Sequence, residues 1–343
     1  MRLLDRRSSD EWEQQVAGTI RALRRRVLTP DVSETLVSTR GFHVKNPESR
    51  TILETVGSSF LTGLSSAAGA RQVTDVDTDL AALPTRFQGF AYEGAAMGFA
   101  LVDALTPGTP RRSAAFLAGT GDRHVYMAYV GIGWALARLP KFLWRRALAG
   151  ATDPLLRWLV HDGYGFHQAY FHTDAYVHGR RAVTDFPWPP EGPTAYAARA
   201  IDQGIGRATW FVAGCDPTVA ADLIDRFPAA RREDLYSGAG LAATYAGGCT
   251  SDELREFAAR SGEHAPFVAQ ASAFAAQARI RAGLLVPHTE LATQVFCRAS
   301  AADAGRVTDE LIPAGPDASG LPAYEVWRRA VAARFRADAR VQP

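Results

Sequence analysis

Apolar residues recur every three or four positions along most of the chain, the spacing that places them on one face of an α-helix. Residues 47–68 show this spacing most clearly and are predicted to form a core helix. The stretches 90–105 and 125–139 are also apolar, and each contains a pair of glycines that lets a neighbouring helix backbone approach closely. Strand-like alternation is rare, so the sequence predicts a mainly α protein with at most a short hairpin over residues 170–185.

The N-terminal region predicts an amphipathic helix over residues 10–28 on the outside of the protein. Asp10 is a candidate N-terminal cap, and the basic run Arg24–Arg26 suits the C-terminal end of a helix. Residues 30–42 are predicted to form an extended connection to the core helices.

Parts of the sequence recur about 140 residues later in the same order. Three pairs of segments are similar: 83–98 with 227–242, 124–137 with 264–277, and 60–63 with 211–214. Such order is what an internal duplication leaves. We therefore expect two similar tandem helical halves that face each other across a pseudo-two-fold axis, with a ligand cavity between them.

A proline-rich segment separates the two proposed halves. Residues 185–193, DFPWPPEGP, contain four prolines, which exclude regular secondary structure and predict a linker. The expected organisation is an N-terminal helical extension at 1–35, a first half at 36–184, this linker, and a second half at 194–343.

Composition limits the classes of function. The chain has 343 residues, 47 % of them hydrophobic, which is enough for a substantial core. Its 38 Lys and Arg residues nearly balance 36 Asp and Glu residues, so we expect no nucleic-acid partner. Three separated cysteines argue against a disulfide framework or a structural zinc site. No signal peptide or membrane-spanning run is apparent, so we expect a soluble cytoplasmic protein, of undetermined oligomeric state.

The densest group of proton-active side chains lies between His161 and His178, a segment that holds four of the eight histidines. If this segment is one helix, its histidines fall on two stripes that face different neighbours. Gly163 and Gly165 are unfavourable inside a helix and favour a different structure. We expect a turn over residues 162–165 that leads into a helix from Phe166.

Candidate acid–base residues come from this segment and from the apolar stretch 90–105. They are Asp162, His167, His161, His172 and Glu93. Asp162 at a helix start would stay ionised and orient the substrate, and His167 would exchange a proton near neutral pH. Glu93 would replace His167 as the donor if burial kept it neutral. The alternative is structural: the histidines cap helices or lie exposed, and Glu93 forms an ion pair with an arginine.

Candidate substrate-binding residues are aromatic, imidazole or thioether side chains near these groups: Tyr92, Met97, His124, Tyr164 and Trp210. No metal is expected, because no His-Glu-x-x-His or Cys/His spacing is present. No cofactor is expected either, because Gly204 and Gly206 lack the third glycine of a dinucleotide motif and no phosphate loop occurs. An aspartate-rich diphosphate–magnesium motif is also missing, which argues against ordinary ionising terpene synthases.

Six short strings resemble the UnbL-type family over about residues 35–335. They are RGFH at 40–43, LETVG at 53–57, GFAYEGAAMG at 89–98, GDRHVYM at 121–127, DGYGFH at 162–167 and GRATWF at 206–211. Proteins of that family are often encoded beside the iterative polyketide synthases of enediyne biosynthesis in actinobacteria. The resemblance implies a role in natural-product assembly with a hydrophobic polyene as substrate, and it implies no particular reaction.

Two classes of function therefore follow. One is a cofactor-independent enzyme that cyclises or isomerises a hydrophobic polyene of enediyne, polyketide or terpenoid type by acid–base catalysis. The other is a non-catalytic protein that binds the polyene or docks on its polyketide synthase or another pathway enzyme. A closed pocket with convergent polar groups would favour the enzyme, and an open apolar groove would favour the binding protein.

Overall fold

The computed structural model describes residues 2–189, 194–315 and 320–341, and the regular elements within these ranges are all helices. The prediction of a mainly α protein is confirmed. Seven helices build the centre: α3 (Pro47–Gly69), α5 (Thr85–Leu105), α7 (Val125–Arg138), α9 (Trp158–Phe171), α10 (Thr194–Val212), α12 (Ala229–Tyr245) and α14 (Ala265–Ala282). The predicted helices at 47–68, 90–105 and 125–139 correspond to α3, α5 and α7.

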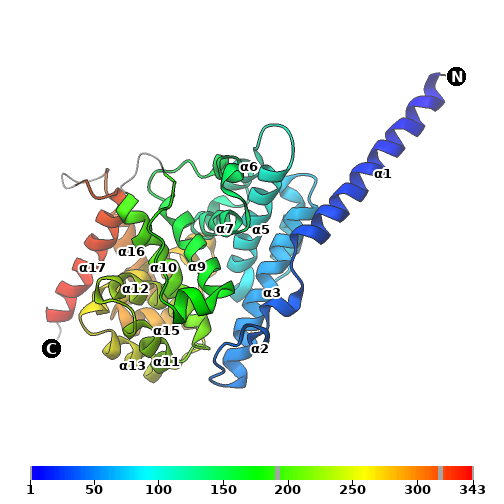
Figure 1. The fold of residues 1–343 in the computed structure, drawn as a ribbon. Coiled ribbons are helices and arrows are strands. Elements are labelled where there is room, and N and C mark those ends of the chain that lie inside the picture. The colour runs from blue at the N-terminus through cyan, green and yellow to red at the C-terminus, as the bar shows by residue number, and fades with distance from the viewer. Residues whose placement is uncertain (1, 190–193, 316–319, 342–343) are drawn as a thin grey trace.

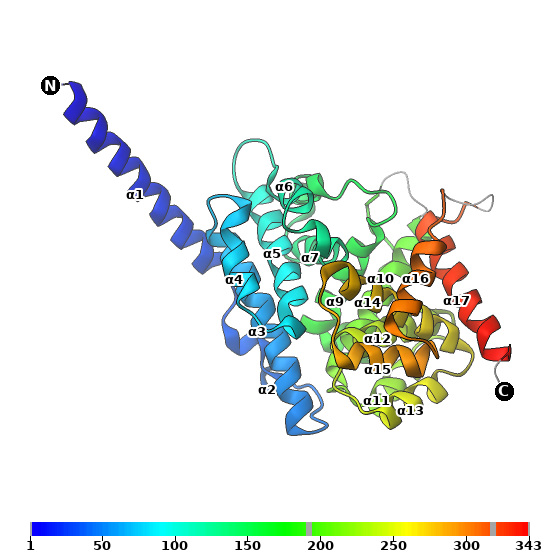
Figure 2. The same cartoon turned by 180° about the vertical axis from the view of Figure 1, so that it is seen from behind.

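Shorter helices connect these elements or cover their ends. They are α4 (Asp77–Ala81), α6 (Arg112–Ala118), α8 (Trp144–Ala147), α11 (Pro217–Asp225), α13 (Ser251–Ser261), α15 (Pro287–Phe296) and α16 (Ala301–Glu310). The last helix, α17 (Ala323–Val341), packs on α14 at the end of the molecule away from α1 (Figures 1 and 2).

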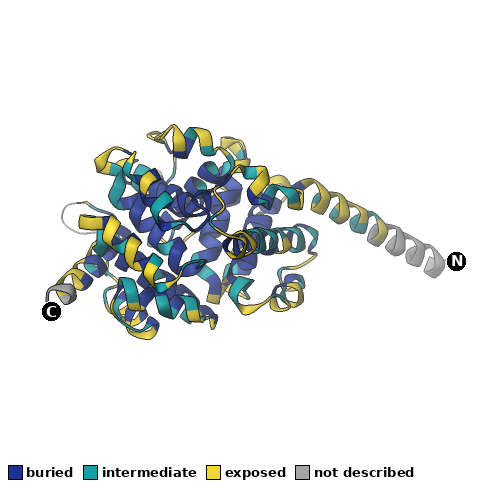
Figure 3. Cartoon of the chain, turned by 90° about the horizontal axis from the view of Figure 1, so that it is seen from below, coloured by how far each residue is buried: buried dark blue, intermediate teal, exposed yellow. Residues whose placement is uncertain are grey.

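The seven central helices pack in chain order, each on the next one along the sequence. The series also curls back on itself, because the start of α5 touches the end of α12. There the Phe90 and Tyr245 rings meet edge to face at 5.2 Å, and Arg86 Nη2 donates to the Ala246 carbonyl at 2.9 Å. The helices from α5 to α12 thus surround a central space, and the residues around it are buried (Figure 3).

Glycines let these helices cross with their backbones in contact. A Cβ added to Gly63 of α3 would lie 1.8 Å from the Ala91 carbonyl oxygen of α5, and one added to Gly94 would lie 2.0 Å from that of Phe60. The same kind of contact, at about 2 Å, recurs along the series at Gly131, Gly133, Gly163, Gly165, Gly204, Gly206 and Gly238. Any side chain at these crossings would push the helices apart.

The predicted turn at residues 162–165 is wrong, because α9 runs without a break from Trp158 to Phe171. Gly163 and Gly165 instead lie where α9 crosses its neighbouring helices. A Cβ at Gly163 would lie 2.0 Å from the Val130 carbonyl oxygen of α7, and one at Gly165 would lie 2.1 Å from that of Ile201 of α10. The helix tolerates both glycines because the tertiary contacts offset their low helix propensity.

The N-terminal region differs from the prediction in two respects. Helix α1 (Arg2–Leu28) begins before the predicted residue 10, and its N-terminal part projects from the body (Figures 1 and 2). Residues 30–42 are not extended but contain a 3₁₀ turn, η1 (Val32–Thr35), and the short helix α2 (Val37–Arg40). Asp31 starts η1 by accepting a hydrogen bond from the Ser33 backbone N–H at 2.9 Å.

The described part of the proline-rich segment, residues 185–189, contains no helix or strand, and residues 190–193 lie outside the described ranges. Phe186 is buried against Trp144 and His161, with ring centroids 5.0 and 4.7 Å away. The start of this segment is therefore packed on the helices before it.

Among the described residues, no helix combines the length and the apolar character that crossing a bilayer requires.

The crossings predict a difference between two Gly→Ala substitutions. Gly63→Ala should lower the free energy of unfolding by at least about 1–3 kcal/mol, because its methyl group meets the Ala91 carbonyl. Gly18→Ala in α1 is the control, since its methyl group meets only the end of the Arg21 side chain at 3.8 Å. It should be neutral or stabilise the helix by up to about 1 kcal/mol. Urea denaturation measures both values, and equal effects would contradict the proposed role of the crossing.

Candidate functional site

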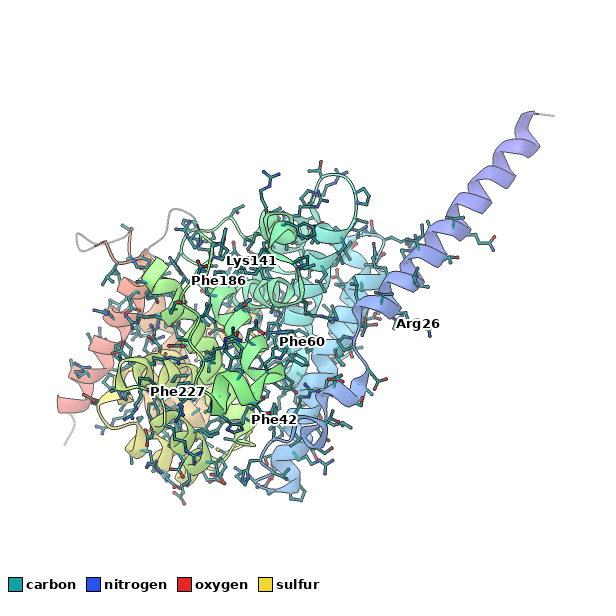
Figure 4. All side chains as sticks on the ribbon, in the orientation of Figure 1. Arg26, Phe42, Phe60, Lys141, Phe186 and Phe227 are labelled. Atoms are coloured by element: carbon teal, nitrogen blue, oxygen red, sulfur yellow. The ribbon has the colours of Figure 1, made fainter. Side chains whose placement is uncertain are left out.

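A cavity of about 540 Å³ lies inside the curled series of helices. Its walls come from α3, α5, α7, α9, α10 and α12, and residues 30–35 contribute to one end. Eight of the lining residues are aromatic: Phe60, Phe90, Trp134, Phe166, Tyr170, Phe171, Phe211 and Tyr245. Phe60, labelled in Figure 4, lies on the α3 side of this wall. The volume and the lining suit a hydrophobic small molecule.

One carboxyl group lies on the inner wall. Glu93 of α5 is only 3 % exposed and lines the cavity. Burial raises the pKa of Glu93 from an ordinary value of 4.5 to about 7, the Arg207 charge opposes this rise, and the negative charge of Asp162 adds to it. Glu93 is therefore divided between its acid and carboxylate forms near neutral pH.

Arg207 of α10 joins the two buried carboxyl groups. Its Nε atom lies 2.8 Å from Asp162 Oδ1, whereas its Nη2 atom lies 4.0 Å from Glu93 Oε1. Burial also raises the pKa of Asp162, but Arg207 opposes that rise from the shorter distance. Because one guanidinium charge balances one carboxylate, we assign the negative charge to Asp162 and the retained proton to Glu93.

Helix crossings fix the positions of these three residues. The Glu93 carbonyl oxygen lies 2.0 Å from where a Cβ of Gly131 would be, and the Asp162 carbonyl oxygen lies 1.9 Å from that of Gly204. Arg207 directly follows the crossing residue Gly206. Its guanidinium also lies 4.8 Å from the centre of the Phe166 ring, a cation–π contact.

His167 lines the same cavity but remains neutral. Burial lowers the pKa of His167 to about 3, and the nearby charges of Arg138 and His172 lower it further. This low pKa argues against the expectation that His167 exchanges a proton near neutral pH. Its imidazole meets the Trp134 indole edge to face at 5.4 Å and forms part of the aromatic wall.

The cavity has an exposed rim and a buried inner part. Asp31, Arg138 and His172 line it and are exposed, so they mark its outer rim. Glu93 and Tyr245 line it and are buried, so they mark its inner part. His172, predicted as a catalytic candidate, therefore lies at the entrance rather than beside Glu93.

The other predicted site residues are divided between this cavity and the core. Met97 lines the cavity. Asp162 forms an ion pair with Arg207, which also lines the cavity. Tyr92 and His124 stack on each other at 3.5 Å and do not line the cavity. Tyr92 belongs to a separate core cluster with Phe116.

Three further candidates also lie elsewhere. His161 does not line the cavity. Its Nε2 atom lies 2.6 Å from the Trp188 carbonyl oxygen, and its ring stacks on the Trp188 indole. The Tyr164 hydroxyl accepts a hydrogen bond from Gln168 Nε2 at 2.8 Å, outside the cavity. Trp210 is fully buried, and its Nε1 atom donates to a backbone carbonyl at 3.4 Å. Their contacts are those of structural residues.

Sequence reasoning missed Arg207 and Tyr245. Arg207 stood within one of the strings that carry the family resemblance, and an arginine partner for Glu93 was considered without being assigned. Tyr245 gave no signal beyond its place in an apolar stretch. Within the described ranges, no group of three or more His, Cys, Asp or Glu residues is arranged to hold a metal ion.

The raised pKa of Glu93 predicts a pH-dependent effect of Glu93→Gln on stability. As pH rises from 4.5 to 7, unfolded Glu93 loses its proton while folded Glu93 keeps it, so the wild-type protein loses about 3 kcal/mol of stability at this position. Glu93→Gln lacks this titrating group, so its free energy of unfolding minus that of the wild type should rise by about 3 kcal/mol between pH 4.5 and 7. Urea denaturation at pH 4.5 and 7.5 measures this change. Glu310→Gln, at an exposed position, is the control, and its free energy of unfolding should differ from that of the wild type by the same amount at both pH values.

Removing the negative charge of Asp162 should lower the pKa of Glu93. In Asp162→Asn, Arg207 has Glu93 as its remaining carboxylate partner, and the repulsion that favoured the proton is lost. Infrared difference spectra of the protonated carboxyl band, with Glu93→Gln as the assignment control, measure this pKa. The same change at an exposed position, Asp174→Asn, should leave the pKa of Glu93 unchanged. An unchanged band in Asp162→Asn would refute the assignment of the charges.

Comparison with known proteins gives one match. A family model described as a protein of unknown function, DUF1702, matches residues 19–335. No curated protein and no solved structure matches the chain. Because the match covers most of the sequence, the chain belongs to the DUF1702 family, whose function is not known.

Proposed function

We propose that the protein is a cofactor-independent enzyme that isomerises or cyclises a hydrophobic polyene by moving a proton with Glu93. The observation that carries this proposal is a buried carboxyl group with a pKa of about 7 on the inner wall of an aromatic cavity. A group of that pKa both donates and accepts protons near neutral pH, which is the requirement for general acid–base catalysis.

The reaction needs no oxidant or reductant. Glu93 gives its proton to one carbon of a double bond, and the two π electrons form the new C–H bond. The neighbouring carbon becomes electron-poor, and loss of a proton from the next carbon back to the Glu93 carboxylate forms a double bond at a new position. In a cyclisation, a second double bond of the chain attacks the electron-poor carbon before that proton leaves.

The surroundings of Glu93 support such a reaction. The aromatic walls exclude water and stabilise positive charge on the chain through their π faces. Arg207 and Asp162 balance each other, so the site can hold an uncharged ligand without an unpaired charge. The proposed role of Asp162 is to hold Arg207 beside the cavity through their ion pair; Asp162 does not lie at a helix start as expected, because α9 begins at Trp158.

The biological setting is part of the same proposal. We place the protein among the UnbL-type members of its family, in the cytoplasmic assembly of a natural product of the enediyne or a related class. Its expected partners are a hydrophobic small molecule and the polyketide synthase or other enzymes that make it. The support is the six shared sequence strings and the apolar character of the cavity.

We also propose that the chain arose from two tandem helical halves at 36–184 and 194–343. The support is the recurrence of one crossing pattern. In the first half Gly63 and Gly94 of α3 and α5 meet the carbonyls of Ala91 and Phe60. About 143 residues later, the α10 and α12 crossing has the same form: Gly206 and Gly238 meet the carbonyls of Leu235 and Gln203. This correspondence places Gln203, not Phe211, opposite Phe60 in the alignment of the halves.

The halves would then differ at the catalytic position. Ser237 occupies the place of Glu93, and its hydroxyl donates a hydrogen bond to Gln270 Oε1 at 3.2 Å. This pair is neutral and satisfied, so acid–base chemistry would be confined to the first half.

An accessory role in docking is the second candidate, and one observation favours it. Ile20, Leu23 and Val27 of the projecting helix α1 are 57–66 % exposed and lie on one stripe. Such a stripe suits a protein partner, and it is compatible with catalysis in the cavity.

The proposal predicts which substitutions abolish turnover of a conjugated polyene, followed by the change in its absorbance. Glu93→Gln should reduce kcat/KM by at least about 100-fold, because the amide cannot exchange a proton. Glu310→Gln, the same change at an exposed position, should leave kcat/KM unchanged. His167→Ala should act by less than about tenfold, since its imidazole stays neutral.

Circular dichroism and thermal melting would show that each variant is folded. A folded Glu93→Gln variant with wild-type turnover would rule out the catalytic role. If neither it nor the wild type changes a bound polyene, the protein is a binding protein.

A further inference from the structure

The inner part of the cavity contains hydrogen-bond donors without acceptors. Trp134 Nε1, Arg207 Nη2 and Tyr245 Oη are buried, and none makes a hydrogen bond of normal geometry with another described residue. All three residues line the cavity. Buried donors in folded proteins are nearly always paired, so donors that converge on one cavity indicate an acceptor on the ligand.

These donors surround the carboxyl group of Glu93. Arg207 Nη2 lies 4.0 Å from Glu93 Oε1, beyond hydrogen-bond distance, and the Trp134 indole N–H gives the Glu93 carboxyl group a weak hydrogen bond that opposes the rise of its pKa. The Tyr245 hydroxyl lies 1.9 Å from where a Cβ of Gly89 would be, which places it against α5 one helical turn before Glu93. A ligand acceptor that reaches these donors therefore lies in the part of the cavity that Glu93 lines.

The charges at the site determine what kind of acceptor fits. An indole N–H and a guanidinium only donate, so the ligand atom must be an acceptor. A carboxylate or phosphate would add negative charge beside Asp162 and Glu93, whose single cation is already paired with Asp162. A neutral carbonyl oxygen accepts two or more hydrogen bonds and adds no charge.

We infer that the substrate is a polyene with a neutral carbonyl group, a ketone or an aldehyde, conjugated with its double bonds. The carbonyl oxygen accepts hydrogen bonds from Trp134, Arg207 and Tyr245, and the chain extends along the aromatic wall. This inference rests on the proposed function, because it names the substrate on which Glu93 acts.

On a carbonyl substrate the two proton transfers occur in the reverse order of the scheme for an unsubstituted polyene: the carboxylate form of Glu93 acts first, as a base, and the charge on the chain is negative. The Glu93 carboxylate removes a proton from the saturated carbon that follows the double bond next to the carbonyl, the γ carbon. The electrons of that C–H bond shift along the chain, and the carbonyl oxygen becomes an enolate oxygen that the three donors stabilise. Glu93 then returns the same proton to the carbon beside the carbonyl group, so the double bond moves and nothing is oxidised or reduced.

A matched pair of probes tests the inference: a linear conjugated tetraene with a methyl ketone at one end, and the hydrocarbon of equal length. Equilibrium dialysis, with the polyene absorbance as readout, gives the affinity of the full-length protein for each. The wild-type protein should bind the ketone at least about tenfold more tightly than the hydrocarbon. Tyr245→Phe and Trp134→Phe should each weaken ketone binding by about fivefold and change hydrocarbon binding by less than about twofold.

Tyr164→Phe is the control, because it removes the same hydroxyl group from a tyrosine outside the cavity. Its affinity for both probes should equal that of the wild type. The carbonyl stretch of the bound ketone, recorded by infrared difference spectroscopy, should lie at lower wavenumber in the wild type than in Tyr245→Phe. This second readout needs only one of the two cavity variants to fold.

Equal affinity of the wild type for both probes would overturn the inference. An equal loss of affinity for the ketone and for the hydrocarbon in Tyr245→Phe would also overturn it. A carbonyl stretch of the bound ketone at the same wavenumber as in hexane would do so too. Repeating the binding in Glu93→Gln separates this result from the proposed function. If the protein prefers the ketone but shows no turnover that depends on Glu93, the inference about the substrate stands and the proposed enzymatic function is rejected. If the protein converts the hydrocarbon and shows no preference for the ketone, the enzymatic function stands and the inference about the substrate is rejected.

Discussion

Direct contact between helix backbones at glycine residues is the constraint on which the structure depends. Each crossing from α3 to α12 has a glycine against a carbonyl oxygen of its neighbour, so the helices pack closer than side chains would permit. Close packing in chain order brings α5, α9 and α10 together, and with them Glu93, Asp162 and Arg207. The ion pair is therefore a product of the crossings rather than a reason for them.

The electrostatics of the site follow from an imbalance of buried charge. Two carboxyl groups share one guanidinium, and the closer one takes the negative charge. The other keeps its proton because ionising it would leave an uncompensated charge in an apolar region. A near-neutral pKa thus needs no histidine. Burial lowers the pKa of His167 and His161 in α9, so these two side chains are neutral parts of the wall and the core.

The sequence allowed the core helices and Glu93 to be predicted, because helical periodicity and a carboxyl group in an apolar helix are local signals. It did not allow Arg207 to be paired with Asp162, since 45 positions separate them and only tertiary packing brings them together. Gly163 and Gly165 were assigned to a turn because a glycine that ends a helix and one that permits a crossing look the same in one sequence. His161 and Tyr164 were grouped with His167 by position, yet they face another side of α9.

The crossings are formed by glycines and backbone carbonyl groups, whereas the cavity is lined by the side chains of other residues of the same helices, and Phe60 and Glu93 take part in the crossings only through their carbonyl oxygens. None of the crossing glycines of α3, α5, α7, α9, α10 or α12 lines the cavity, and wall residues such as Phe90, Met97 and Leu241 take no part in them. Selection can therefore reshape the wall for a longer, shorter or branched chain while the scaffold stays intact. This separation makes the family a suitable starting point for directed evolution, with the wall as the region to vary.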